Sequence, residues 1–71
     1  MNLEQMGRSM RAMRKQAGKS VSQTARKTGV GEGTLYAYES GKINPGLVNL
    51  CLLAEYYGVT LDELVFSGGK A

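Results

Sequence analysis

The side chains that could bind a ligand through charge are the cations of this sequence, and they are concentrated toward the N-terminus. Residues 1–42 contain eight basic and three acidic side chains, whereas residues 43–71 contain one basic and three acidic side chains. Lysine and arginine neutralise phosphates, and clusters of them are typical of surfaces that bind polyanions. The charge distribution therefore predicts a basic face for a polyanion and a separate, mildly acidic face. A solvated surface of mixed sign is the alternative interpretation.

Other kinds of chemistry have little support in the sequence. It contains no histidine and one cysteine, Cys51, so the commonest general base and metal ligand is missing. We predict that the protein is not an enzyme and that it binds no metal, no cofactor and no small-molecule substrate. The single cysteine fits a reducing cytosol, and neither a signal peptide nor an apolar run of membrane-spanning length is present. We therefore expect a cytoplasmic protein without a membrane partner.

The elements that must position the cations are short helices. Seventy-one residues allow one small domain, and no segment alternates like a strand, so we predict an all-α fold with five helices. Sequences of the capping-box type begin at Asn2, Ser20 and Thr60. The helices are expected at residues 3–17, 21–28, 32–40, 46–57 and 61–66. Residues 1–66 form the predicted domain, and residues 67–71 are interpreted as a flexible tail.

The helix expected at residues 46–57 is apolar on most of its positions, so we interpret it as the central helix of the core. Its predicted core stripe comprises Leu47, Leu50, Cys51, Leu53, Ala54 and Tyr57. Cys51 is interpreted as a small buried apolar residue, and the methionines at 6, 10 and 13 as core residues of the first helix. Tyr38 is expected in the core and Tyr36 at the surface.

The order of motifs along the chain is more specific than the charge. Gly29-Val30-Gly31 separates two short helices, which is the pattern of a helix, a glycine-containing turn and a second helix. With its flanking segments, residues 6–66, this order resembles the helix-turn-helix domains of the phage repressor and Cro type (the lambda-repressor-like regulators). The stretches that carry the resemblance are Met6-Gly7-Arg8 with Met10-Arg11 and Met13-Arg14, then Ala25, Gly29 and Val30, Thr34-Leu35, Tyr38 to Lys42, Asn44-Pro45, Leu50 to Val59, and Leu61 to Leu64.

The resemblance implies a protein that binds duplex DNA with the helix at 32–40 in the major groove. The implied base-facing positions are Glu32, Gly33 and Ala37, with Tyr36 as a DNA-facing neighbour. The implied contacts to the DNA backbone involve Ser20, Val21, Ser22, Thr34, Lys42 and Asn44. Arg14 and Glu39 are implied as an ion pair that holds the helix in place.

The chemistry of these residue types can be argued separately. Backbone N–H groups at the start of a helix, here near Ser20 to Ser22, are natural donors to phosphate. Lys42 would add a charge contact, Ala37 could pack on a thymine methyl group, and Glu32 could accept a hydrogen bond from cytosine N4. Three positions depart from the family pattern, because glutamine is common where Val21 stands, and glutamine or serine where Glu32 and Gly33 stand. Val21 can donate no side-chain hydrogen bond, and Gly33 has no side chain that could contact a base.

One small domain makes few base contacts, so we expect a homodimer on an operator with two half-sites. The predicted dimer surface comprises Tyr56, Tyr57, Val65 and Phe66. The expected function is sequence-specific regulation of transcription, as a repressor, in a bacterium or a phage. Two alternatives stay open: a module that keeps this fold for binding another protein, and the antitoxin of a toxin–antitoxin pair with weak DNA binding.

Overall fold

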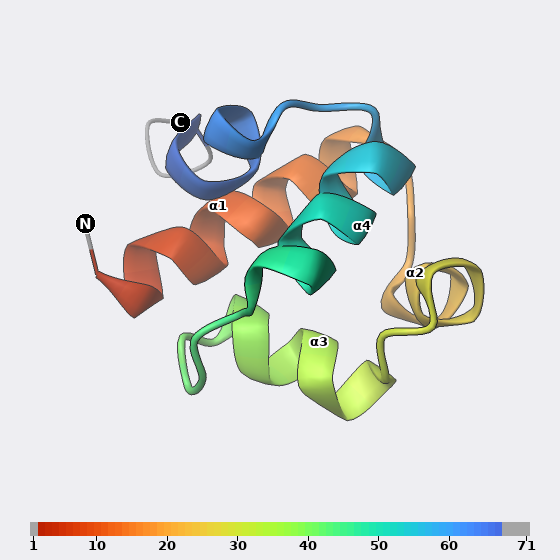
Figure 1. Ribbon diagram of the computed structural model, residues 1–71, viewed down its shortest axis with the longest axis horizontal. Helices are drawn as coiled ribbons and strands as arrows, with labels where there is room; N and C mark the ends of the chain where they lie inside the picture. Colours follow the sequence, from red (N-terminus) through yellow and green to blue (C-terminus); the bar gives the residue numbers. More distant parts are fainter. Residues whose placement is uncertain (1, 68–71) are drawn as a thin grey trace.

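Helical segments account for all the regular structure in residues 2–67, the part of the chain that the computed structural model describes (Figure 1). These segments are α1 (Leu3–Gln16), α2 (Val21–Thr28), α3 (Glu32–Glu39), α4 (Leu47–Tyr57) and η1 (Glu63–Ser67). The last is a single π-helical turn that continues from two α-helical residues, 61 and 62. The all-α prediction with five helices is confirmed. Ser67 belongs to η1, and the rest of the predicted tail lies outside the described residues.

The helices begin and end where the local sequence signals place them. All three predicted capping boxes form: the Asn2 side chain accepts from the Gln5 N–H at 2.8 Å, that of Ser20 from the Gln23 N–H at 3.0 Å, and that of Thr60 from the Glu63 N–H at 3.1 Å. In each box the partner side chain accepts from the backbone N–H of the capping residue. These bonds satisfy N–H groups that the first turn of a helix leaves without partners.

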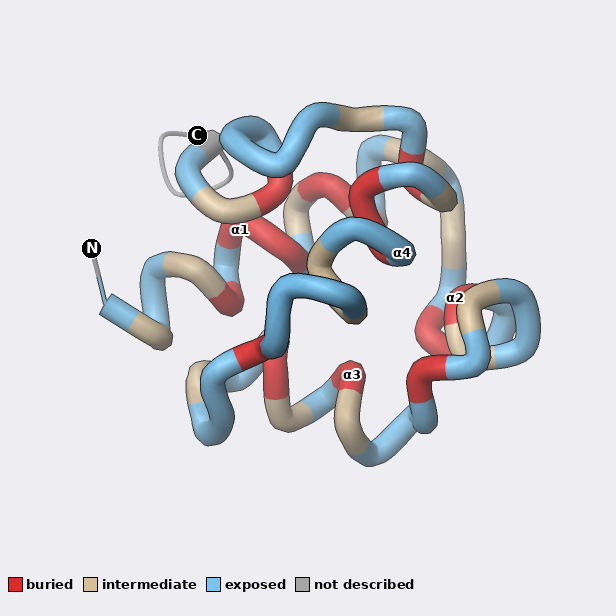
Figure 2. Tube along the Cα trace, in the orientation of Figure 1, coloured by how far each residue is buried: buried red, intermediate tan, exposed pale blue. Residues whose placement is uncertain are grey.

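All five helical segments contribute side chains to the core. Helix α1 contacts η1 and α3, and α2 contacts α3 and α4. Figure 2 shows the buried segments on the inward sides of these helices. The buried apolar side chains are Met10, Met13, Val21, Val30, Leu35, Tyr38, Leu53, Ala54, Tyr57 and Leu64. None of the helices in residues 2–67 combines the length and the apolar character needed to cross a membrane.

Helix α4 departs from the predicted packing. Only Leu53, Ala54 and Tyr57 are buried, whereas the side chains of Leu47 and Cys51 are exposed. The assignment of Leu47 and Cys51 to the core is therefore wrong. An almost continuously apolar helix has no polar face, so periodicity alone does not determine which side turns inward.

Candidate nucleic-acid interface

The turn between α2 and α3 is fixed by side chains as well as by its glycines. The Val30 side chain is buried, and its backbone N–H donates to Oγ1 of Thr28 at 3.2 Å. The Thr28 hydroxyl in turn donates to the carbonyl oxygen of Thr24 at 2.7 Å. Gly29 ends α2 with a left-handed backbone at φ +81°, a conformation that glycine adopts without strain. The relative placement of the two helices is thus set by the core and by a short chain of hydrogen bonds.

The outer side of α3 faces solvent. Glu32, Gly33 and Tyr36 are exposed, and Ala37 is half-buried. Gly33 and Ala37 are four residues apart and so lie on one side of the helix. On the opposite side, Leu35 and Tyr38 are buried, as expected for Tyr38 from the sequence. The predicted base-facing residues therefore share one accessible side of α3, and their contact with bases stays a prediction.

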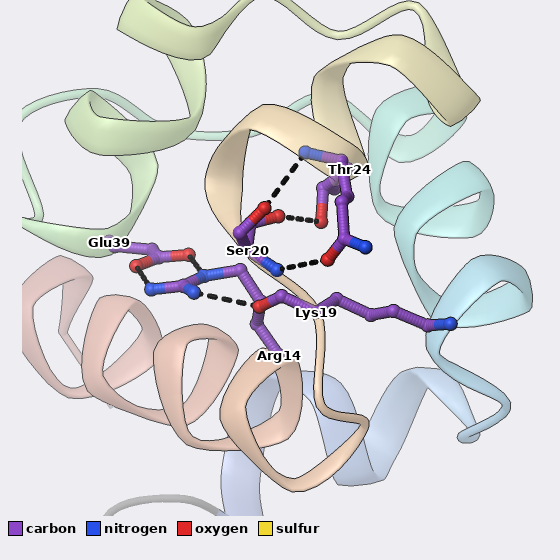
Figure 3. Close-up of polar contacts among 6 residues, drawn as sticks. Arg14, Lys19, Ser20, Thr24 and Glu39 are labelled. Atoms are coloured by element: carbon purple, nitrogen blue, oxygen red, sulfur yellow. Dashed lines mark hydrogen bonds and ion pairs between the residues drawn. The ribbon is translucent and has the colours of Figure 1, made fainter.

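The C-terminal end of α3 is joined to α1 by a bidentate ion pair (Figure 3). Nε of Arg14 donates to Oε2 of Glu39 at 2.7 Å, and Nη2 donates to Oε1 at 3.0 Å. A third bond runs from Nη1 to the carbonyl oxygen of Lys19 at 2.9 Å, so the same guanidinium also holds the segment before α2. The two side chains are only 11% and 8% exposed. The hydrogen bonds that Arg14 donates to Glu39 raise the pKa of Arg14 although burial opposes this, so the guanidinium remains charged.

Two glycines bring α3 and α1 into contact more closely than any other residue type would permit. A Cβ at Gly7 would lie 2.5 Å from the carbonyl oxygen of Glu39 and 2.6 Å from that of Tyr38. Gly41 has φ +78°, and a Cβ there would lie 2.9 Å from Cα of Glu4. From the sequence, Gly7 is predicted only as part of a family pattern, and its close approach to the backbone of α3 is not. The available signal was a glycine inside a long regular helix, which often marks close packing.

Replacing Gly7 with alanine should lower the free energy of unfolding by about 1–3 kcal/mol, because the new methyl group meets backbone atoms that cannot move aside. Gly33→Ala is the matched control, since it lies in α3 with open space around it and should stabilise the helix by about 1 kcal/mol. Thermal melts followed by circular dichroism measure both effects. Equal shifts of the two variants in the same direction would contradict the close-packing role.

The predicted contacts to the DNA backbone fall at both ends of the helix pair. Ser20 and Ser22 are exposed at the start of α2, and Lys42 and Asn44 are exposed in the loop between α3 and α4. Thr34 is half-buried on α3. Val21 needs a correction, because its side chain is 5% exposed and packs in the core. The backbone N–H of Val21 still lies in the first turn of α2, where the N–H groups of a helix have no partner within the helix and can donate to phosphate.

The predicted dimer surface is also partly corrected. Tyr57 is 8% exposed and belongs to the core, where burial raises the pKa of its phenol. The Tyr56 ring is half-buried and lies beneath Nζ of Lys19, 5.2 Å from the ring centroid. Val65 is half-buried, and Phe66 is exposed. Of the four predicted residues, only Phe66 offers a large free apolar side chain.

A hollow of about 320 Å³ lies beside the ion pair, where α1 meets α3. Its lining comprises Arg11, Arg14, Tyr36, Glu39 and Ser40. In the sequence, Arg11 is one of several cations and part of a stretch that carries the resemblance, and the fold places it next to the outer side of α3. The basic surface of α1 therefore continues to α3. Residues 2–67 contain no group of three His, Cys, Asp or Glu side chains that could hold a metal ion.

A helix-turn-helix unit with an accessible second helix beside basic residues defines a class of DNA-binding proteins. A family model described as helix-turn-helix matches residues 10–64, and the chain belongs to this family, of the lambda-repressor and Cro type. The fold is similar to the crystal structure of the restriction-modification controller protein C.AhdI from Aeromonas hydrophila, with a TM-score of 0.82. The two share 29% identity over 87% of this chain and 94% of the other. No curated protein matches the sequence.

These similarities identify the chain as a DNA-binding regulator of transcription. The prediction of the family from the sequence is confirmed. The roles of individual residues on DNA are not tested by the similarities and are taken up as proposals below.

Proposed function

We propose that this protein represses transcription by binding a specific duplex operator as a homodimer, with α3 of each copy in the major groove. The observation that carries the proposal is the contrast between the two sides of α3. One side is fixed by the Arg14–Glu39 ion pair and the close contact at Gly7, whereas the other has free access to solvent. A helix held in this way is preorganised, so it enters a groove without the free-energy cost of rearranging the protein.

Each end of the helix pair has a role on the DNA backbone in this proposal. The N–H groups at the first turn of α2, at Val21 and Ser22, donate to one phosphate, and the Ser20 and Ser22 hydroxyls add polar contacts. Lys42 and Asn44 contact a phosphate beyond the other end of α3. Thr34 supports these contacts from α3 itself. The protein is thereby oriented on the duplex before any base is distinguished.

Few side chains remain to distinguish bases. Glu32 accepts from the N4 amino group of cytosine, and the Ala37 methyl group packs on a thymine methyl group. Tyr36 lies at the edge of the same side and contacts the sugar or base next to them. Because one good base contact contributes about 1–3 kcal/mol, a single copy recognises DNA weakly, and two copies on a two-fold operator provide the needed specificity.

The similarity to C.AhdI favours a particular setting for this regulator. That protein is described as a restriction-modification controller, and it covers most of this chain. Control of a restriction-modification gene pair is therefore the second, narrower candidate. Under it, the operator lies upstream of the genes for the two enzymes, and binding there sets their level.

Gel-shift titrations of random duplex DNA at several salt concentrations test the DNA-binding proposal, and selection from a random duplex pool identifies the operator. A DNA-binding regulator shows salt-dependent binding to any duplex and much tighter binding to the selected one. Absence of binding at low salt would favour the protein-interaction module. Binding that tightens only when a partner protein is added would favour an antitoxin.

Lys42→Ala should weaken binding to all duplexes by a similar factor and lower the slope of log affinity against log salt by about one unit. Lys27→Ala is the control, because Lys27 is an equally exposed lysine at the far end of α2 from its first turn. Gel shifts of both variants against the selected operator and against random duplex provide the comparison. A change of sequence preference without a change of salt slope would show that Lys42 does not contact phosphate.

A further inference from the structure

Three exposed large apolar side chains, Leu47, Val48 and Leu52, gather on one side of α4. We propose that two copies of the chain pair through this side, which comprises Leu47, Val48, Cys51, Leu52 and Glu55 and is called the α4 face below. The two α4 helices run antiparallel, and the two Cys51 residues meet near the two-fold axis. This inference names the interface of the proposed homodimer and rests on that part of the proposed function.

The exposure of the α4 face is unusual for an isolated chain. Leu47 is 68% exposed, Val48 73% and Leu52 38%, and Cys51 is exposed between them. Together with Glu55 they line a shallow hollow of about 310 Å³. Scattered exposed leucines are ordinary, but a contiguous apolar patch with a hollow is typical of an interaction surface.

The sequence of α4 makes this face complementary to a second copy of itself. From residue 47 to residue 54 the helix carries no charged side chain, so two such faces bring no like charges together. Leu47 and Glu55 are eight residues apart, or about 12 Å along the helix axis, with Cys51 midway. In an antiparallel pair centred on Cys51, the Glu55 of one copy lies opposite the Leu47 of the other. A two-fold interface requires this kind of reciprocal match.

The ends of the face complement one another in charge. The residue that precedes α4, Gly46, provides no side-chain cap, and the first turn of the helix contains no acidic residue. Its N-terminus therefore presents free N–H groups and partial positive charge. The antiparallel arrangement brings the exposed carboxylate of Glu55 from the second copy to this N-terminus. Two equivalent contacts of this kind form in one dimer.

The α4 face is also connected to the proposed DNA-binding helix. Asn49, in the first turn of α4, donates through Nδ2 to the Tyr38 hydroxyl of α3 at 2.8 Å. Pairing through α4 would therefore fix the distance between the two α3 helices, which a two-fold operator requires. On the surface predicted from the sequence, by contrast, only Phe66 is largely exposed.

The single cysteine of the chain provides a direct test of the interface. Oxidation, or a short bismaleimide reagent, should convert wild-type protein to a covalent dimer through Cys51 at concentrations where sedimentation shows a dimer. Cys51→Ser combined with Phe66→Cys is the matched variant, with its thiol on the rival surface, and it should cross-link at least about tenfold more slowly. The reason is that a disulfide needs Cα atoms within about 7 Å.

Sedimentation equilibrium of point variants measures how each side chain affects the dissociation constant of the dimer. Val48→Glu should raise the dissociation constant of the dimer at least about tenfold, because it buries a carboxylate in each half of an apolar interface. Glu55→Gln should raise it about threefold to tenfold. Phe66→Ser should leave it unchanged. Circular dichroism confirms that each exposed substitution leaves the monomer folded.

Each result bears on the interface separately from DNA binding. A dimer that resists cross-linking at Cys51, or that is lost in Phe66→Ser and kept in Val48→Glu, overturns the inference. A protein that stays monomeric in solution and on its operator also overturns it, while DNA binding stands. A Cys51-linked dimer that binds no DNA supports the interface and contradicts the proposed function.

Discussion

Ala37→Asp should abolish binding to the operator, with a loss of at least about 100-fold in affinity, while the domain stays folded. Ala37 is half-buried on the same side of α3 as Gly33, with its Cβ toward the proposed groove. A carboxylate at this position is repelled by the phosphates on both sides of the groove and cannot pack on a thymine methyl group. The loss corresponds to about 3 kcal/mol, which is the upper end of what one good base contact contributes.

The control for Ala37→Asp must add the same charge elsewhere. Thr60→Asp does so at an exposed N-cap position, where aspartate can replace threonine as the acceptor from the Glu63 N–H. The α4–η1 connection that contains Thr60 lies at the opposite end of the molecule from α3 (Figure 1). Gel shifts and thermal melts of both variants are needed. Equal binding by Ala37→Asp and wild type, with both folded, would remove α3 from the groove.

Arg14→Met and Glu39→Gln should each lower the free energy of unfolding by about 3 kcal/mol. Each variant leaves the other member of a buried pair without its charged partner, which is costly in proteins. Arg14→Met also removes the donor to the Lys19 carbonyl oxygen. Small domains are stabilised by only about 5 kcal/mol, so a loss of this size exceeds half of the total.

Arg11→Met is the matched control for the ion pair. It makes the same change of residue type on α1, at an exposed arginine for which no ion pair is present within residues 2–67. Its effect on unfolding should stay within about 0.5 kcal/mol. The double variant Arg14→Met/Glu39→Met should be more stable than either single variant, because no charge is left unpaired. Single variants that melt like wild type would show that the pair does not stabilise the domain.

The ends of the helices could be predicted from the sequence because they are decided locally. Asn2, Ser20 and Thr60 each have their capping partner three residues away, so the bond that begins the helix lies inside a short window of sequence. The Arg14–Glu39 pair joins residues far apart in the chain, and it could be anticipated only through the family resemblance. The structure then provided its bidentate geometry.

Other features depend on which surfaces meet, and short windows of sequence do not contain this information. Leu47 and Cys51 share their residue types with core positions, yet no other part of the described chain covers that side of α4. Tyr57 belongs both to the predicted core stripe and to the predicted partner surface, and its burial at 8% exposure assigns it to the core. The closeness of Gly7 to Glu39 depends on how α1 crosses α3. A glycine within a helix therefore indicates close packing at that position, but not which residue it packs against.

The attachments of α3 are distributed unevenly along its length. Its last turn contacts Gly7, Arg14 and Asn49. Its first turn follows Gly31, which provides no side-chain cap, and contains Glu32 and Gly33, with open space around Gly33. The start of α3 is thus held by the buried Val30 and Leu35, whereas its end at Glu39 is held to α1 by an ion pair and a close backbone contact as well. Under the proposed docking, adjustment to operators whose grooves differ slightly in width is expected at the Gly33 end of this eight-residue helix, where a side chain adds no bulk, rather than at the Glu39 end.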